Sequence, residues 1–207
     1  MKIQAVVVSA LAGVLLPFFG GGFVQADTRQ YTLGDTDDFV YEGTGSVDDV
    51  YVNPDLVSYL SGAWSEPQHD FDVYQADHVV PFSFTFPLAA GEQVTAAWLT
   101  MGLRYVIGTI DSDKLWLYTM PDNQLWDYRY DDLGWLPIPS SPTVERTVDL
   151  ANVLGDDHLD LLQDRMFDAF LQDDCAVDYA ILTIEVIPGP ASMALLGLGS
   201  LALLRRR

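Results

Sequence analysis

The sequence predicts an all-β protein whose central part is a two-sheet β-sandwich of the jelly-roll type with one short helix. Three observations lead to this prediction. Short segments rich in β-branched and aromatic residues recur along the chain with alternating apolar and polar side chains, as in half-buried strands. The 25 aspartates far outnumber the five glutamates, and Asp favours loops and turns. Long helices do not alternate with strands, so a parallel α/β sheet is not expected.

Six strands are expected in the first half of the chain, at residues 39–41, 50–52, 56–60, 71–74, 78–86 and 94–107. In the fifth of these, Val80, Phe82 and Phe84 share one face, because successive side chains of a strand point to opposite sides of the sheet. The sixth has apolar residues on both faces, which predicts a central strand. Pro54 separates the second strand from the third.

The second half is expected to add a hairpin, a short helix and three further strands. The hairpin joins strands at 115–118 and 125–130 through Met120-Pro121-Asp122-Asn123, whose composition favours a turn. Asp156 or Asp157 is placed to cap a short helix over 157–164, where Leu159 and Leu162 have helical spacing. The other strands are expected at 143–150, 167–171 and 176–186, with a helix running on to Leu171 as the alternative to the second of these.

Residues 1–26 have the composition of a secretory signal peptide. Lys2 precedes an apolar run over 3–16, and Pro17, three glycines and small residues follow it. This order predicts cleavage between Ala26 and Asp27. The alternative is a retained signal anchor, which the proline and the glycines disfavour because they interrupt a continuous helix.

Residues 187–207 have a different composition, with an apolar stretch between a proline-rich tripeptide and a basic cluster. The tripeptide is Pro188-Gly189-Pro190, the stretch is 191–204, and the cluster is Arg205, Arg206 and Arg207. At about 1.5 Å per residue the stretch is about 21 Å long as a helix, which is less than the ~30 Å of a hydrocarbon core. It is therefore suited to hold the chain in a membrane temporarily, with the arginines on the cytoplasmic side.

The tail resembles the PEP-CTERM sorting signal of bacterial exosortase substrates. That signal is a Pro-Glu-Pro tripeptide, a segment rich in Gly, Ala and Leu, and an arginine cluster; Gly189 stands here where the family has glutamate. The resemblance implies export in a Gram-negative bacterium, transient inner-membrane insertion, cleavage near the tripeptide by an exosortase-type enzyme, and delivery to the cell surface or extracellular matrix. It implies exopolysaccharide as a partner and assigns no activity to the central domain. The alternative is an ordinary single-pass tail anchor.

Between the two ends, residues 27–186 are expected to form one acidic domain. Six basic residues stand there against 30 acidic ones, which gives a formal charge of −24. This charge argues against nucleic-acid binding, since Lys and Arg must replace the counterions of the phosphates. It favours divalent cations or saline surroundings.

Clusters of aspartate predict a calcium site, because Ca²⁺ takes about six to eight oxygen ligands from carboxylates and loop carbonyls. The candidate ligands are Asp35, Asp37, Asp38, Asp173, Asp174 and Asp178. Residues 172–180 also resemble the closing region of jelly-roll modules of exported bacterial proteins, some of which bind carbohydrate. The alternative is a solvated acidic surface, and the sequence contains no EF-hand loop.

Aromatic residues are dense over 116–135 and predict a carbohydrate platform formed by Trp116, Trp126, Tyr128 and Trp135. The alternative is that these rings pack in the core. The sequence contains no Gly-x-Ser-x-Gly elbow and no His-Glu-x-x-His motif, so no catalytic residue and no enzyme is expected. The expected function is that of an exported, non-enzymatic surface or matrix protein. A carbohydrate-binding module, with or without calcium, is the alternative.

Overall fold

The structure is a computed structural model of the chain, and it describes residues 26–35, 50–66, 68–73, 78–106, 113–119, 124–155, 159 and 162–189. Residues 1–25 of the predicted signal peptide, the predicted strand at 39–41, the hairpin turn at 120–123 and the apolar tail lie outside this part. Within it, no helix is both long and apolar enough to cross a membrane.

The described residues form eight strands and two α-helices. In chain order these are β1 (Asp27–Gly34), α1 (Pro54–Ala63), β2 (His78–Thr85), β3 (Glu92–Tyr105), β4 (Lys114–Thr119), β5 (Gln124–Arg129), β6 (Val144–Asp149), α2 (Leu150–Leu154), β7 (Met166–Asp173) and β8 (Cys175–Pro188). The seven strands from β2 to β8 lie where the sequence predicts strands.

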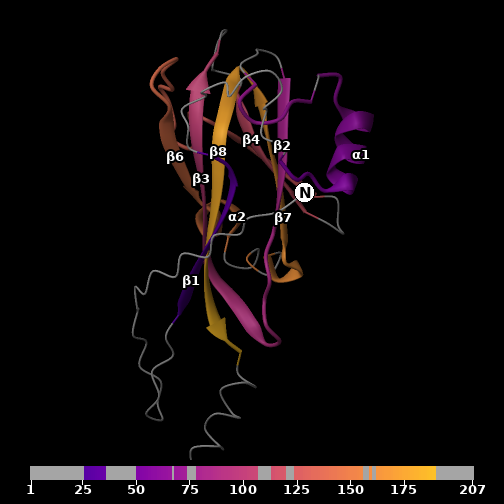
Figure 1. Cartoon of the computed structure of the whole chain (residues 1–207), viewed down its shortest axis with the longest axis vertical. Coiled ribbons are helices and arrows are strands. Elements are labelled where there is room, and N and C mark those ends of the chain that lie inside the picture. Colours follow the sequence, from indigo (N-terminus) through magenta and orange to yellow (C-terminus); the bar gives the residue numbers. More distant parts are fainter. Residues whose placement is uncertain are drawn as a thin grey trace, which may run out of the picture.

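The strands form two four-stranded antiparallel sheets that face each other (Figure 1). Their orders are β1-β8-β3-β6 and β2-β7-β4-β5. Strand 1 therefore pairs with 8, 2 with 7, 3 with 6 and 4 with 5, as in a long hairpin that has been rolled up. This is the jelly-roll arrangement, and it confirms the predicted all-β sandwich.

The core fills the space between the two sheets. On β3 every second residue from Ala97 to Leu103 is fully buried, and Phe82 and Phe84 of β2 belong to the same apolar cluster. The shared core face predicted for Val80, Phe82 and Phe84 is therefore confirmed. β3 lies between β8 and β6, which also confirms it as a central strand.

Residues 56–60 are helical, so their prediction as a strand is wrong. Asn53 caps α1 through its side-chain oxygen, which accepts a backbone hydrogen bond at 3.1 Å. Pro54 occupies the first turn, where its missing N–H costs nothing because the first N–H groups of a helix have no acceptor within the helix. Leu56 and Leu60 are four residues apart and therefore lie on the same face of the helix. Both are fully buried, so this is the face that packs on the protein.

Helix α1 covers the outer face of the β2-β7-β4-β5 sheet (Figure 1). Its two buried leucines pack with Val79, Tyr118 and Phe170 in a second apolar cluster. Because α1 lies on one side and the facing sheet on the other, β2 is buried on both of its faces.

Other expectations also differ from the structure. Residues 50–52 are irregular, so their prediction as a strand is wrong. Residues 71–73 form a turn and an irregular residue where a strand over 71–74 is predicted, and the described part of the predicted helix at 157–164 has 3₁₀ geometry. Helix α2, which Asp149 caps, is not predicted. Nor is β1, an edge strand with several exposed polar residues, so that its apolar alternation is weak.

A buried carboxylate lies beneath the start of α1. Asp168 of β7 is 3% exposed. Its Oδ2 accepts a hydrogen bond from Nδ2 of Asn53 at 2.8 Å, and Oγ of Ser83 accepts one from the backbone N–H of Asn53 at 2.8 Å. Burial raises the pKa of Asp168, while hydrogen bonds from Ser83 and Asn53 oppose the rise. The cluster ties the capping residue of α1 to both β2 and β7.

We expect Asp168→Asn to stabilise the protein by about 1 kcal/mol at neutral pH. A carboxyl group whose pKa is raised on folding contributes its full stability at low pH, and this is lost as the pH rises through the folded pKa. The amide removes the buried charge and keeps an oxygen for Asn53. Urea unfolding at about pH 7.5 and about pH 3 checks this, since the gain should vanish where the carboxyl is neutral in both states. An Asn variant less stable than the wild type at neutral pH would contradict it.

Candidate functional site

The two predicted processing points lie together at one end of the sandwich. β1 begins at Asp27, immediately after the predicted signal-peptide cut, and β8 ends at Pro188, the first residue of the tripeptide. Asp27 is opposite Val186 in the antiparallel register of the two strands. On its other side β8 pairs with β3, where Pro188 is opposite Glu92. We call this part of the molecule the junction end, comprising residues 27–29, 86–94 and 184–189; the start of β1 and the end of β8 lie at the bottom of Figure 1.

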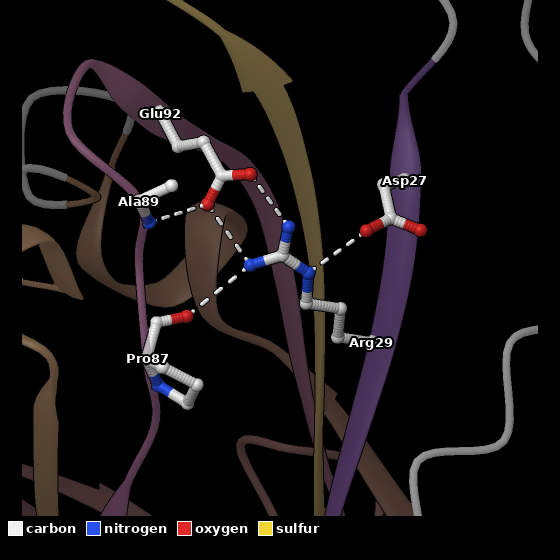
Figure 2. Close-up of polar contacts among 5 residues, drawn as sticks. All are labelled: Asp27, Arg29, Pro87, Ala89 and Glu92. Carbon is white, nitrogen blue, oxygen red and sulfur yellow. Dashed lines mark hydrogen bonds and ion pairs between the residues drawn. The ribbon is translucent and has the colours of Figure 1, made fainter.

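An arginine clamp closes the junction end (Figure 2). Arg29 of β1 donates two hydrogen bonds to Glu92 of β3, at 2.6 Å from Nη2 and 3.0 Å from Nη1. The same guanidinium donates to the carbonyl of Pro87 at 3.2 Å and to Asp27 at 2.8 Å. Glu92 also accepts from the N–H of Ala89 at 2.8 Å. The clamp thus joins the two strands that flank β8 and orders the connection from β2 to β3.

The clamp is a charge-assisted, bidentate pair in a partly protected place. The side chains of Arg29 and Glu92 are each 20% exposed. The hydrogen bond from Arg29 is the main cause that lowers the pKa of the Glu92 carboxyl, and the same bond raises the pKa of Arg29. Sequence reasoning missed this pair, because the two residues are 63 positions apart and no local pattern links them.

The residues of the predicted sorting signal are only partly described. Pro188 is half-buried and closes β8, and Gly189 is buried. A Cβ atom added to Gly189 would overlap the backbone carbonyl of Gly91. Pro190, Arg205, Arg206 and Arg207 lie outside the described residues.

The predicted calcium ligands differ in how far they are exposed to solvent. Asp35 is exposed just after β1, whereas Asp174 and Asp178 are buried at 6% and 2% exposure. Asp173 ends β7, and Asp37 and Asp38 lie outside the described residues. In the described part of the chain, no group of three or more His, Cys, Asp or Glu side chains is arranged to hold a metal ion. Calcium binding therefore stays a prediction from the sequence.

A further buried carboxylate lies at the opposite end of the sandwich. Asp113 is fully buried, and its two oxygens accept from the backbone N–H of Asp174 at 3.4 Å and from Sγ of Cys175 at 3.2 Å. These contacts hold the turn from β7 into β8. Cys175 is the one cysteine of the sequence, and its side chain is buried.

The four predicted platform aromatics do not share a surface. Trp116 is opposite Asp127 in the β4–β5 register, and Trp126 is opposite Leu117, so the two tryptophans point to opposite faces. Trp126 and Tyr128 pack half-buried against the main core, where the Tyr128 hydroxyl donates to the carbonyl of Val153 at 2.7 Å. Trp135 is 2% exposed. The register of the hairpin, which sequence spacing does not determine across a turn, separates them.

Trp116 alone faces outward, in a half-exposed aromatic and polar cluster beside α1. Its ring stacks on Phe170 at 5.6 Å and 8°, and the edge of Trp64 meets it at 5.1 Å. Its Nε1 donates to Gln172 at 2.9 Å, and the ammonium of Lys114 is 5.0 Å from its ring. An aromatic ring flanked by amide and charged groups is a surface on which a sugar can stack and form hydrogen bonds.

No protein-family model matches this sequence, and no curated protein matches it.

Proposed function

We propose that this protein is an exported, non-enzymatic component of the cell surface or extracellular matrix of a Gram-negative-type bacterium, sorted by an exosortase-type enzyme. The observation that carries the proposal is the order of the tail: Pro188-Gly189-Pro190, an apolar stretch and Arg205, Arg206 and Arg207. The tail serves for transient insertion in the inner membrane, and the enzyme is the partner that removes it.

The position of the junctions supports the proposal. The sandwich extends from Asp27 to Pro188, so cleavage at the two predicted points leaves every described strand in place. The two segments to be removed would also leave from the same end of the domain.

The sorting reaction is tested by expressing the full chain in a host with an exosortase and in the same host with that gene deleted. We expect the surface protein of the first host to lack residues 1–26 and 191–207 by intact mass, because the arginine cluster and the short span hold the tail for cleavage. In the deletion host the uncut tail should keep the protein in the inner-membrane fraction.

A variant with Arg205, Arg206 and Arg207 all changed to Gln is the matched control, since it keeps the tail length and removes only its charge. It should keep residues 191–207 in the first host, as the wild type does in the deletion host. A wild-type surface species that retains residues 191–207 in the presence of the enzyme would refute the proposal.

A second candidate function is carbohydrate binding, with the exopolysaccharide of the matrix as the ligand. The outward cluster of Trp116, Gln172 and Lys114 favours it. We expect Trp116→Ala to reduce retardation in gels containing the host exopolysaccharide by roughly tenfold, as for loss of a central aromatic anchor. Trp98→Ala is the control, because Trp98 is also half-buried and lies on the outer face of the other sheet. Equal losses for the two variants would contradict a site at Trp116.

A further inference from the structure

The middle residue of the sorting tripeptide is part of the folded domain. Gly189 is buried directly after β8, and its α-carbon faces the backbone of Gly91 so closely that any side chain at 189 would overlap the Gly91 carbonyl. Glutamate, the residue of the PEP-CTERM family at this position, does not fit. The presence of glycine at position 189 therefore has a physical reason in the packing of this domain.

The surface that receives Gly189 is held in a defined shape. Gly91 has a φ of 83°, a left-handed conformation that a side chain disfavours. On the next residue, the Glu92 N–H donates to the carbonyl of Ala89 at 3.1 Å while its carboxylate accepts from the Ala89 N–H at 2.8 Å. The Arg29 clamp fixes the same carboxylate from β1. The turn before β3 is thus ordered from both sides, with Gly91 at its centre.

The residues that precede Gly189 are also engaged. β8 stays paired with β3 to its end beyond a register shift between Val94 and Ala96, so that Ile187 is opposite Gln93 and Pro188 is opposite Glu92. Peptide-processing enzymes commonly bind their substrate as an extended segment whose backbone groups pair with the enzyme. A segment already paired within a sheet cannot offer those groups until it separates from its neighbour.

We infer that the folded domain shields its own processing tripeptide, and that an enzyme can engage Pro188-Gly189 only after the last residues of β8 detach from β3 and Gly91. The inference rests on the proposed sorting function for its biological meaning, but the shielding itself is a property of the fold. Processing would then depend on local opening at the junction end, without unfolding of the rest of the sandwich.

Shielding is tested on the purified full chain in mild detergent, with a proline-specific endoprotease as the probe. We expect cleavage of the Pro188–Gly189 bond to be slow in the folded wild type and roughly tenfold faster in Gly189→Ala, because the added methyl group pushes the end of β8 away from Gly91. Mass spectrometry of the released C-terminal fragment measures the rate. Gly62→Ala is the matched control, since a Cβ there meets nothing within 4 Å.

A second variant leaves the tripeptide unchanged. Glu92→Gln weakens the clamp and should also accelerate cleavage, whereas Asp131→Asn removes a carboxylate from an exposed pair with Arg129 and should not. Equal cleavage rates for the wild type, Gly189→Ala and Glu92→Gln would overturn the inference. So would rapid cleavage of the wild type under native conditions.

The same variants in the exosortase host separate this inference from the proposed function. Faster processing of both Gly189→Ala and Glu92→Gln than of the wild type supports shielding against the natural enzyme. Identical processing of all three, despite different protease rates, would overturn shielding as a control of sorting while sorting itself stands. If tail removal does not depend on the exosortase, the proposed function fails, and the protease rates still decide the shielding.

Discussion

Leu60→Ala is expected to lower the free energy of unfolding by about 2–5 kcal/mol, the range for truncating a fully buried leucine. Leu60 is on the inner face of α1 and packs with Val79, Tyr118 and Phe170. The cavity would lie between a ten-residue helix and the sheet, and a helix this short depends on its packing because it is marginal alone. Urea unfolding of the wild type and the variant, compared at equal m-value, measures the loss.

The matched control is Val57→Ala on the same helix. Val57 is 37% exposed, so its truncation removes little buried surface and should change stability by less than about 0.5 kcal/mol. If Leu60→Ala were as mild as this control, α1 would not be docked on the sheet as described. The packing of Trp64 against Trp116 would then also be lost, and with it the basis for a sugar site beside α1.

Gly34→Ala is the second change with a large expected effect, at about 3 kcal/mol or more. Gly34 ends β1 with a φ of 72°, which costs an L-residue about 1–2 kcal/mol. A Cβ there would also lie 2.6 Å from the carbonyl oxygen of Asp178 and 2.8 Å from the ring of Phe71. Neither the β8 backbone nor the fully buried ring of Phe71 has room to move. Thermal unfolding followed by circular dichroism measures the effect.

Gly134→Ala separates the cost of the positive φ from the cost of the steric overlap at Gly34. Gly134 has a similar φ of 68°, but a Cβ there meets nothing within 4 Å. It should therefore show the conformational cost alone, about 1–2 kcal/mol. The difference between the two variants then measures the close approach of β1 to β8. Equal effects would show that Gly34 is needed for its backbone angle only.

The local sequence pattern was sufficient to predict a strand where one face of that strand is buried in the core. The alternation in β3 and β8 sets which residues enter the core, and both strands are found where it predicts them. Pattern failed at residues 56–60, since five residues containing Val, Tyr and Leu suit a strand as well as a helix. The capping residue Asn53 and Pro54 were the available indications of a helix start.

The candidate sites also include some that the local sequence can predict and one that it cannot. Order and composition are enough to predict a signal peptide before Asp27 and a sorting tail after Ile187, because export machinery recognises linear segments. The aromatic platform was not predictable in this manner. Whether Trp116 and Trp126 share a face depends on the hairpin register, and that register places Asp127 opposite Trp116.

The sequence by itself determined the all-β class, seven of the eight described strands and the acidic character of the domain, because each follows from short-range alternation or from composition. Only the tertiary structure decided that both predicted processing points share one end, that Arg29 clamps Glu92 there, and that Gly189 packs on Gly91. These contacts join residues far apart in the chain, and they exist only when rolling of the eight strands places β8 between β1 and β3.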